Sequence, residues 1–158
     1  FVANQISDEM TKALVACMHD LKKQGVEGNY VPAQNLHLTL AFIGEYEDPA
    51  KVKRVIENVP LPQFRLSLSE KGNFGNLLWA GVKGNQKLKM YVKDLRDALR
   101  AAGIPFDDDK FIPHITLIRK AAAKKAYQVR LPKAEMTVRK VSLMRSEMKN
   151  GKTVYREM

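Results

Sequence analysis

Two of the three histidines in the chain occur in nearly the same setting, His37-Leu38-Thr39-Leu40 and His114-Ile115-Thr116-Leu117. An imidazole changes its charge near neutral pH, so one of a pair can accept a proton while the other donates one. Phosphoester cleavage uses both steps, because the attacking water must lose a proton and the leaving oxygen must gain one. A hydroxyl beside each imidazole can donate a hydrogen bond to a phosphate oxygen. The repeated pattern therefore predicts phosphoester chemistry that needs neither a metal nor a cofactor.

Both patterns fall in segments where apolar and polar residues alternate, which is typical of β-strands. We expect strands over residues 36–43 and 111–118, with Pro113 indicating an edge position or a bulge in the second. Residues two apart in a strand share a face, so His37 and Thr39 project together while the leucines beside them face the core. The second pair has the same spacing. Each strand thus offers an imidazole and a hydroxyl to water or to a ligand.

Other catalytic chemistries find less support in the sequence. A metal site needs three or four neighbouring ligands, and the chain adds only His19 on a solvated helix face, Cys17 on an apolar one and scattered carboxylates. No Gly-x-Ser-x-Gly elbow is present, and a cysteine on an apolar helix face is a poor nucleophile. The glycines within 71–75 and 81–84 match neither a dinucleotide-binding nor a P-loop pattern, and we interpret them as turns.

The segments around the two motifs predict an α+β fold, in which helices and strands are interleaved without a strict parallel repeat. Apolar residues recur at helical spacing over 7–24, 51–58 and 86–102, with Ser7 as an N-cap and Gly103 as a stop. Alternation predicts further strands over 1–3, 64–69, 77–82, 135–139, 141–146 and 153–155. We expect a long loop between 64–69 and 77–82, and a tight hairpin at Asn150-Gly151. No linker divides the chain, so we expect one domain over 1–158. The strand pattern begins at Phe1 itself, and the sequence leaves open whether residues precede it.

The positive charge is concentrated in the second half of the chain. The net charge is +10, yet residues 1–79 carry eight basic and nine acidic side chains, whereas residues 80–158 carry nineteen and eight. Such a field attracts polyanions, and nucleic acid is the natural candidate. A solvated basic surface explains the charge equally well. A second hypothesis is therefore an RNA- or nucleotide-binding module that holds phosphate without turning it over.

Cysteine content and hydropathy indicate the compartment. Cys17 is the single cysteine, which excludes a disulfide within the chain and favours a reducing cytoplasm. No apolar run approaches the roughly 18 residues of a membrane helix, and the chain does not open on a basic and then apolar leader. We expect a cytoplasmic monomer with no membrane partner.

The two motifs and their context resemble a known family. Residues 35–45 and 111–119, each centred on a His-x-Thr-x pattern, are similar to the motifs of the two-histidine (2H) phosphoesterase superfamily. They look most like those of the bacterial and archaeal RNA 2′,3′-cyclic phosphodiesterases, formerly called 2′-5′ RNA ligases, and the hairpin over 143–155 is also similar. The resemblance implies two similar α+β lobes, related by a pseudo-twofold axis, with antiparallel sheets around a central cleft.

The same resemblance implies an activity and residue roles. RNA or nucleotides with a 2′,3′-cyclic phosphate would be hydrolysed to a 2′-phosphate end. His37 would be the proton donor and His114 the proton acceptor, while Thr39 and Thr116 would hold the phosphate. Nothing in the residues themselves distinguishes the two imidazoles. A 2′-5′ RNA ligase activity, or an enzyme specific for small cyclic nucleotides, remains an alternative.

Two further residues are left open by the sequence. Arg119 matches a basic residue of the family's second motif and could contact phosphate, but strict alternation puts it opposite His114. It would reach the cleft only through a bulge or a change in strand direction, and an exposed arginine at a strand end is an equal alternative. Phe42 falls with Leu38 on the core side, which favours packing over stacking on a nucleobase.

Overall fold

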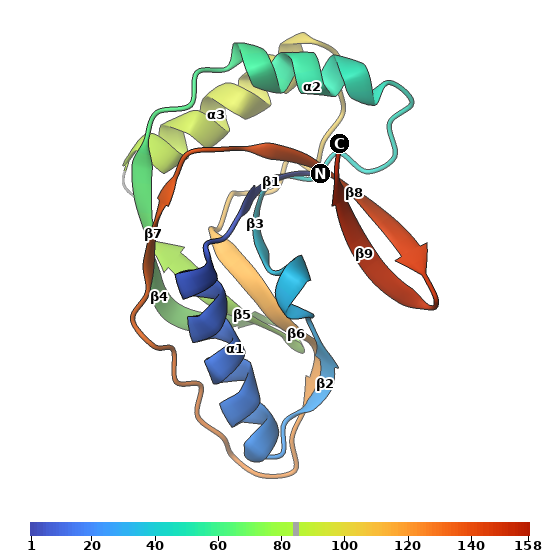
Figure 1. Ribbon diagram of the computed structural model, residues 1–158. Helices are drawn as coiled ribbons and strands as arrows, with labels where there is room; N and C mark the ends of the chain where they lie inside the picture. Colours follow the sequence, from blue (N-terminus) through green and yellow to red (C-terminus); the bar gives the residue numbers. More distant parts are fainter. Residues whose placement is uncertain (84–85) are drawn as a thin grey trace.

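The computed structural model describes residues 1–83 and 86–158, and in these ranges nine strands alternate with three α-helices and one short 3-10 helix (Figure 1). The order is β1 (Val2–Gln5), α1 (Asp8–Lys23), β2 (Glu27–Tyr30), a 3-10 helix (Ala33–Asn35), β3 (His37–Ala41), α2 (Pro49–Asn58), β4 (Phe64–Phe74), β5 (Leu77–Lys83), α3 (Gln86–Ala101), β6 (His114–Ala122), β7 (Glu135–Val138), β8 (Ser142–Lys149) and β9 (Lys152–Glu157). The α+β prediction is confirmed. None of the helices in the described ranges is both long and apolar enough to cross a membrane.

The strands form two antiparallel sheets, and the two histidine strands lie in different ones. The first sheet has the order β3-β1-β8-β9 and the second has the order β2-β6-β5-β4-β7. All seven strand pairs in these sheets are antiparallel. Strand β3 is an edge of the first sheet and β6 lies second from the edge of the other, and the two strands contact each other where the sheets meet (Figure 1).

The helices form where the periodicity predicts them, and their ends are capped. The Ser7 side chain accepts a hydrogen bond of 3.2 Å from the backbone nitrogen of Met10, which stabilises the start of α1 by about 1 kcal/mol. Gly103 adopts φ +74° just after α3, a conformation that a glycine reaches without strain. The apolar faces of α1 and α3 are buried, including Leu14 and Leu95 at 0% exposure, so the helices cover the sheets and hold them in place.

Two glycines interpreted as turn residues lie inside strands instead. Strand β4 continues to Phe74, so the hairpin with β5 is tight and the expected long loop is wrong. Gly72 pairs with Trp79, whose ring occupies the space that a Cβ would need. Gly81 pairs with His114, and the Glu70 carbonyl oxygen lies where its Cβ would be. The missing side chains let Trp79 lie against Gly72 and the Glu70 backbone lie against Gly81, next to His114. Gly84 lies outside the described residues.

The second histidine strand is shifted relative to the prediction. It begins at His114 rather than at residue 111 and runs to Ala122, into a segment with no clear pattern in the sequence. Pro113 lies just before the strand, and its carbonyl accepts a hydrogen bond of 3.1 Å from the backbone nitrogen of Val82. Strand β6 pairs with β5 on one side and with β2 on the other. The sequence did not predict β2, because this short strand is polar and contains a glycine.

Candidate active site

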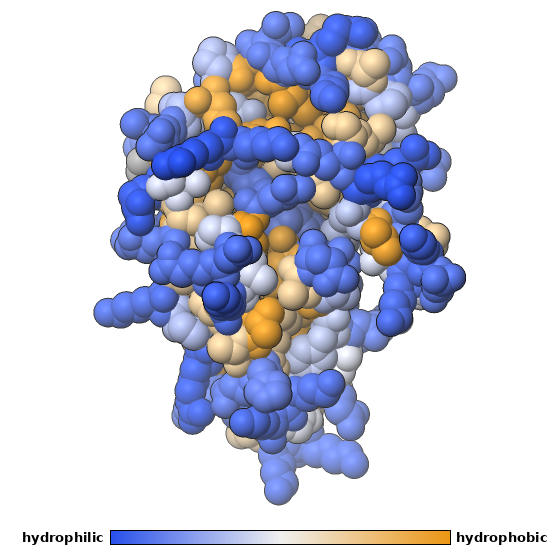
Figure 2. Space-filling model, viewed as in Figure 1, coloured by the Kyte–Doolittle hydropathy of each residue, from blue (hydrophilic) through white to orange (hydrophobic). Residues whose placement is uncertain are grey.

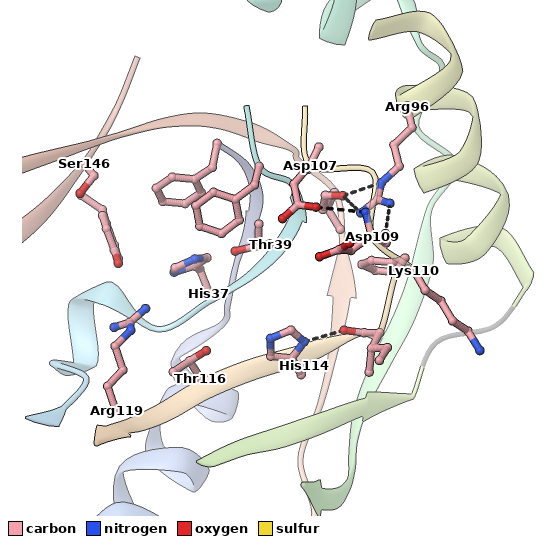
Figure 3. Close-up of a pocket in the computed structure, with 17 residues that line it drawn as sticks. His37, Thr39, Arg96, Asp107, Asp109, Lys110, His114, Thr116, Arg119 and Ser146 are labelled. Carbon is pink, nitrogen blue, oxygen red and sulfur yellow. Dashed lines mark hydrogen bonds between the residues drawn. The ribbon is translucent and has the colours of Figure 1, made fainter. Parts of the chain in front are cut away.

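All five candidate residues line one pocket between the two sheets. His37, Thr39, His114, Thr116 and Arg119 surround a cavity of about 210 Å³ (Figure 3). The pocket also receives side chains from Phe1, from α3, from the segment before β6 and from the β8–β9 hairpin, so stretches far apart in the chain build it.

The alternation expected for the two motifs holds in the structure. In β3 the half-buried His37 and Thr39 face the pocket while Leu38 and Leu40 are buried on the other side. In β6 the half-buried His114 and Thr116 do the same. The core contacts of the intervening residues fix the register, since a slip of one residue would bury the histidines and expose the leucines.

Both imidazoles are oriented in the same way. The Nδ1 atom of His37 lies 2.7 Å from the backbone oxygen of Asn35, and the Nδ1 atom of His114 lies 2.5 Å from that of Ile112 (Figure 3). A carbonyl oxygen only accepts, so each Nδ1 carries a proton that it donates to the residue two positions earlier. The Nε2 atom of each ring is therefore the one that is not held by the backbone. This shared local geometry fits an approximate twofold relation between the lobes.

A β-bulge in β6 brings Arg119 to the pocket. Leu78 pairs with Ile118 and Trp79 pairs with Thr116, so one step along β5 matches two along β6. The extra residue shifts the alternation, and both residue 117 and residue 118 are buried. Arg119 consequently lies on the side of His114 and lines the cavity. The sequence left open whether a bulge directs Arg119 to the cleft or whether the arginine is simply exposed at a strand end, and the structure has the bulge.

Each histidine lies among aromatic side chains. The His37 ring centroid is 4.8 Å from that of Phe1 and 5.1 Å from that of Tyr155. The His114 ring centroid is 5.2 Å from that of Phe74 and 5.5 Å from that of Trp79. These contacts restrict the orientation of each ring and exclude water from one side of it.

The expectation that Phe42 packs in the core is wrong. Strand β3 ends at Ala41, so the alternation that predicted a buried side chain no longer applies at the next residue. Phe42 is 54% exposed, lines the pocket and stacks on Phe1 with ring centroids 5.8 Å apart. An exposed aromatic face beside a polar pocket suits a flat apolar ligand group such as a base.

Arg96 is a pocket residue that the sequence did not single out. It extends from α3, where the helical pattern assigns basic residues to the outer face. Its guanidinium donates a hydrogen bond of 2.7 Å to the backbone oxygen of Asp109 and one of 3.3 Å to the backbone oxygen of Leu40. It thereby joins the segment leading into His114 to the strand that carries His37 (Figure 3). The sequence could not predict this bridging role of Arg96, because it depends on hydrogen bonds to two backbone carbonyls that are far apart in the chain.

Burial lowers the pKa of His37 below the ordinary value of 6.5. The hydrogen bond to the Asn35 carbonyl raises the pKa and so opposes this effect, while the nearby positive charges of Arg119 and of the N-terminus lower it further. The lowered pKa favours the neutral form of His37 in the ligand-free protein at neutral pH. An anion bound between these cations would stabilise the imidazolium and raise the pKa again.

We expect an NMR titration of the imidazole resonances to give a His37 midpoint below 6.5, and saturating inorganic phosphate to move it upward. Because the unfolded chain binds this proton at a higher pH than the folded chain, stability falls as the pH drops through and below 6.5. Urea denaturation should show this slope in the wild type and a flatter one in His37→Gln. A His37 midpoint at or above 6.5 in the free protein would contradict this prediction.

The described residues contain no group of three or more His, Cys, Asp or Glu side chains placed to hold a metal ion. Cys17 is buried in α1, and burial raises the pKa of its thiol to about 11. His19 is exposed on the same helix, away from the pocket residues. The structure does not bring either of these side chains to the site.

Comparisons with known proteins agree with this geometry. Residues 7–150 match the model of the 2′-5′ RNA ligase superfamily. An RNA 2′,3′-cyclic phosphodiesterase of Thermotoga maritima is 30% identical over 129 residues, which are 75% of this chain and 68% of the relative. Crystal structures of E. coli LigT complexed with NADP+ and with 3′-AMP are 28% and 26% identical, with TM-scores of 0.83 and 0.82. Both comparisons cover 100% of this chain, and 92% and 93% of the respective LigT chains.

Proposed function

The chain belongs to the 2′-5′ RNA ligase superfamily, and we propose that it is an RNA 2′,3′-cyclic phosphodiesterase, which hydrolyses cyclic phosphate ends of RNA or nucleotides to 2′-phosphate ends. The observation that carries the proposal is the pair of imidazoles on facing strands, each with Nδ1 held by a carbonyl and Nε2 left for proton exchange. Hydrolysis of a cyclic diester needs one proton acceptor and one proton donor, and this pair supplies both.

In the proposed reaction, Nε2 of His114 accepts a proton from water as the water oxygen bonds to phosphorus. The bond from phosphorus to O3′ breaks, and O3′ takes a proton from Nε2 of His37. One water is consumed, and the product carries a 2′-phosphate and a free 3′-hydroxyl. The bound anionic substrate would raise the pKa of His37 from its lowered value and so favour the imidazolium, the form that can donate a proton to O3′.

Three side chains would hold the phosphate between the histidines. The hydroxyls of Thr39 and Thr116 and the guanidinium of Arg119 line the same cavity, and each is a hydrogen-bond donor. Donors that are already positioned stabilise negative charge as it develops on the phosphate oxygens in the transition state. Phe42 would stack on the terminal base, which its exposure and its contact with Phe1 support.

A 2′-5′ RNA ligase activity is the second candidate, favoured by the superfamily to which the chain belongs. An RNA 5′-hydroxyl that takes the place of water would attack the same phosphorus and expel the same O3′. We further propose that the protein acts as a cytoplasmic monomer. All the proposed catalytic and phosphate-binding groups come from one chain, and the single cysteine is buried.

The test is incubation of the purified protein with adenosine 2′,3′-cyclic phosphate in excess chelator, followed by separation of 2′-AMP from 3′-AMP. We expect 2′-AMP, undiminished by the chelator and with a bell-shaped dependence of the rate on pH. A parallel reaction with a 5′-hydroxyl RNA measures the ligated fraction. Exclusive formation of 3′-AMP would reverse the proposed leaving oxygen, and tight binding with no product would favour the binding-module alternative.

A further inference from the structure

The β8–β9 hairpin extends from the pocket to the outside of the molecule. Ser146 and Tyr155 are cross-strand partners, and both line the pocket. The hairpin then projects beyond the body of the four-stranded sheet (Figure 1). It ends in the turn Asn150-Gly151, whose φ angles of +53° and +75° are those of the tight turn that the sequence predicted. The last pair before the turn, Lys149 and Lys152, lies three residues outward from Ser146 and Tyr155, or about 10 Å along the strand.

The pocket face of the hairpin continues outward to an exposed methionine, Met148. Residues two apart share a face, so the pair Met148 and Thr153 lies on the same side as the pair in the pocket. Met148 is 70% exposed, and its sulfur lies 3.6 Å from the Thr153 hydroxyl. A flexible thioether beside a binding pocket adapts to flat apolar groups.

Two lysines oppose each other at the hydrophilic end of the hairpin (Figure 2). Lys149 and Lys152 are direct cross-strand partners, an arrangement of like charges that destabilises a sheet. The next pair of cations, Arg145 and Arg156, has Glu147 within 3.8 Å of both side chains. Within the described ranges, neither lysine at the tip has a salt-bridge partner. A bound polyanion would remove their mutual repulsion.

The hairpin is also fixed relative to a catalytic histidine. The side-chain amide of Asn35 donates a hydrogen bond of 2.9 Å to the backbone oxygen of Thr153. The backbone oxygen of the same residue accepts from Nδ1 of His37. Asn35 is buried, so both bonds are shielded from water. A ligand on the hairpin is thereby held in a defined position relative to the reacting phosphate.

We propose that the β8–β9 hairpin binds the single-stranded RNA segment on the 5′ side of the cyclic end. Lys149 and Lys152 contact its backbone phosphates, and Met148 packs against one of its bases. The inference rests on the proposed function, since it takes the pocket as the site of the terminal phosphate. The choice of RNA follows from continuity with that pocket and from charge complementarity. It makes the enzyme prefer RNA ends over mononucleotides.

The test compares two substrates and two double variants. Lys149→Ala/Lys152→Ala is assayed on adenosine 2′,3′-cyclic phosphate and on a ten-nucleotide RNA with the same end. We expect kcat/KM for the RNA to fall about 10-fold through KM, and the slope of its logarithm against log salt to weaken by about 0.7 for each lysine. The mononucleotide rate stays unchanged. The matched control Lys124→Ala/Lys125→Ala removes the same charge from the exposed segment after β6.

The readout is the ratio of the two kcat/KM values. An unchanged ratio in the hairpin variant, or an equal fall in the control variant, would overturn the proposal. If the wild type turns over neither substrate, the proposed function fails separately. The same variants then test the hairpin by binding of the RNA, with loss in Lys149→Ala/Lys152→Ala alone as the supporting result and equal binding as the opposing one.

Discussion

Substitution of either His37 or His114 by alanine is expected to lower kcat/KM for a 2′,3′-cyclic phosphate by roughly 10²–10⁴-fold, the usual contribution of a positioned acid or base. Each ring has its Nδ1 held by a carbonyl and its Nε2 available, so each substitution removes one proton transfer. The double variant should lose much less than the product of the two single losses, because both groups act on one transition state.

The control for these variants is His19→Ala, which removes an imidazole from the exposed face of α1 and should leave the rate unchanged. Thermal unfolding of each variant separates loss of chemistry from loss of fold. A double variant that keeps full activity would exclude the two histidines as the catalytic pair.

Substitution of Arg119 by alanine is expected to lower kcat by about 10²-fold, the range seen when one preorganised donor to a developing anion is removed. Arg119→Lys should recover part of the loss, because it keeps the charge but not the planar fork of donors. The bulge that brings Arg119 to the pocket gives a second readout. Arg119 lowers the pKa of His37, so the His37 midpoint should rise toward 6.5 in Arg119→Ala.

The matched control is Arg65→Ala, which removes an exposed arginine that pairs with Glu135 across β4 and β7. It should change neither the rate nor the His37 midpoint. An Arg119→Ala variant with normal kcat and an unshifted His37 titration would place the arginine outside the reaction.

The sequence predicts the site where local rules decide the structure. The alternation in β3 is maintained because Leu38 and Leu40 are buried, and their burial forces His37 and Thr39 to the opposite face. The caps of α1 and the turn at Asn150-Gly151 follow equally local chemistry. Elements of this kind can be predicted without knowing which distant segments they pack against.

The remaining features depend on partners that are distant in the chain. The bulge that turns Arg119 into the pocket is a property of the pairing between β5 and β6, and nothing within residues 114–119 signals it. Phe42 is exposed because the strand ends one residue earlier, and strand ends are set by pairing with β1. In the sequence Gly72 is typical of a turn, but in the structure it is a strand residue whose missing side chain leaves room for the ring of Trp79.

The most direct test of the acid and base assignment is a substrate whose leaving group needs no proton. A 3′-deoxyribonucleoside 2′-phosphodiester of p-nitrophenol, which releases nitrophenolate and has no 3′-hydroxyl to attack the phosphate, is assayed with His37→Ala and His114→Ala. If His37 protonates the leaving oxygen and His114 activates water, His37→Ala regains nearly wild-type activity on this substrate and His114→Ala does not. The reverse pattern would exchange the two roles. If both variants keep full activity on this substrate, acid–base catalysis by this pair is contradicted.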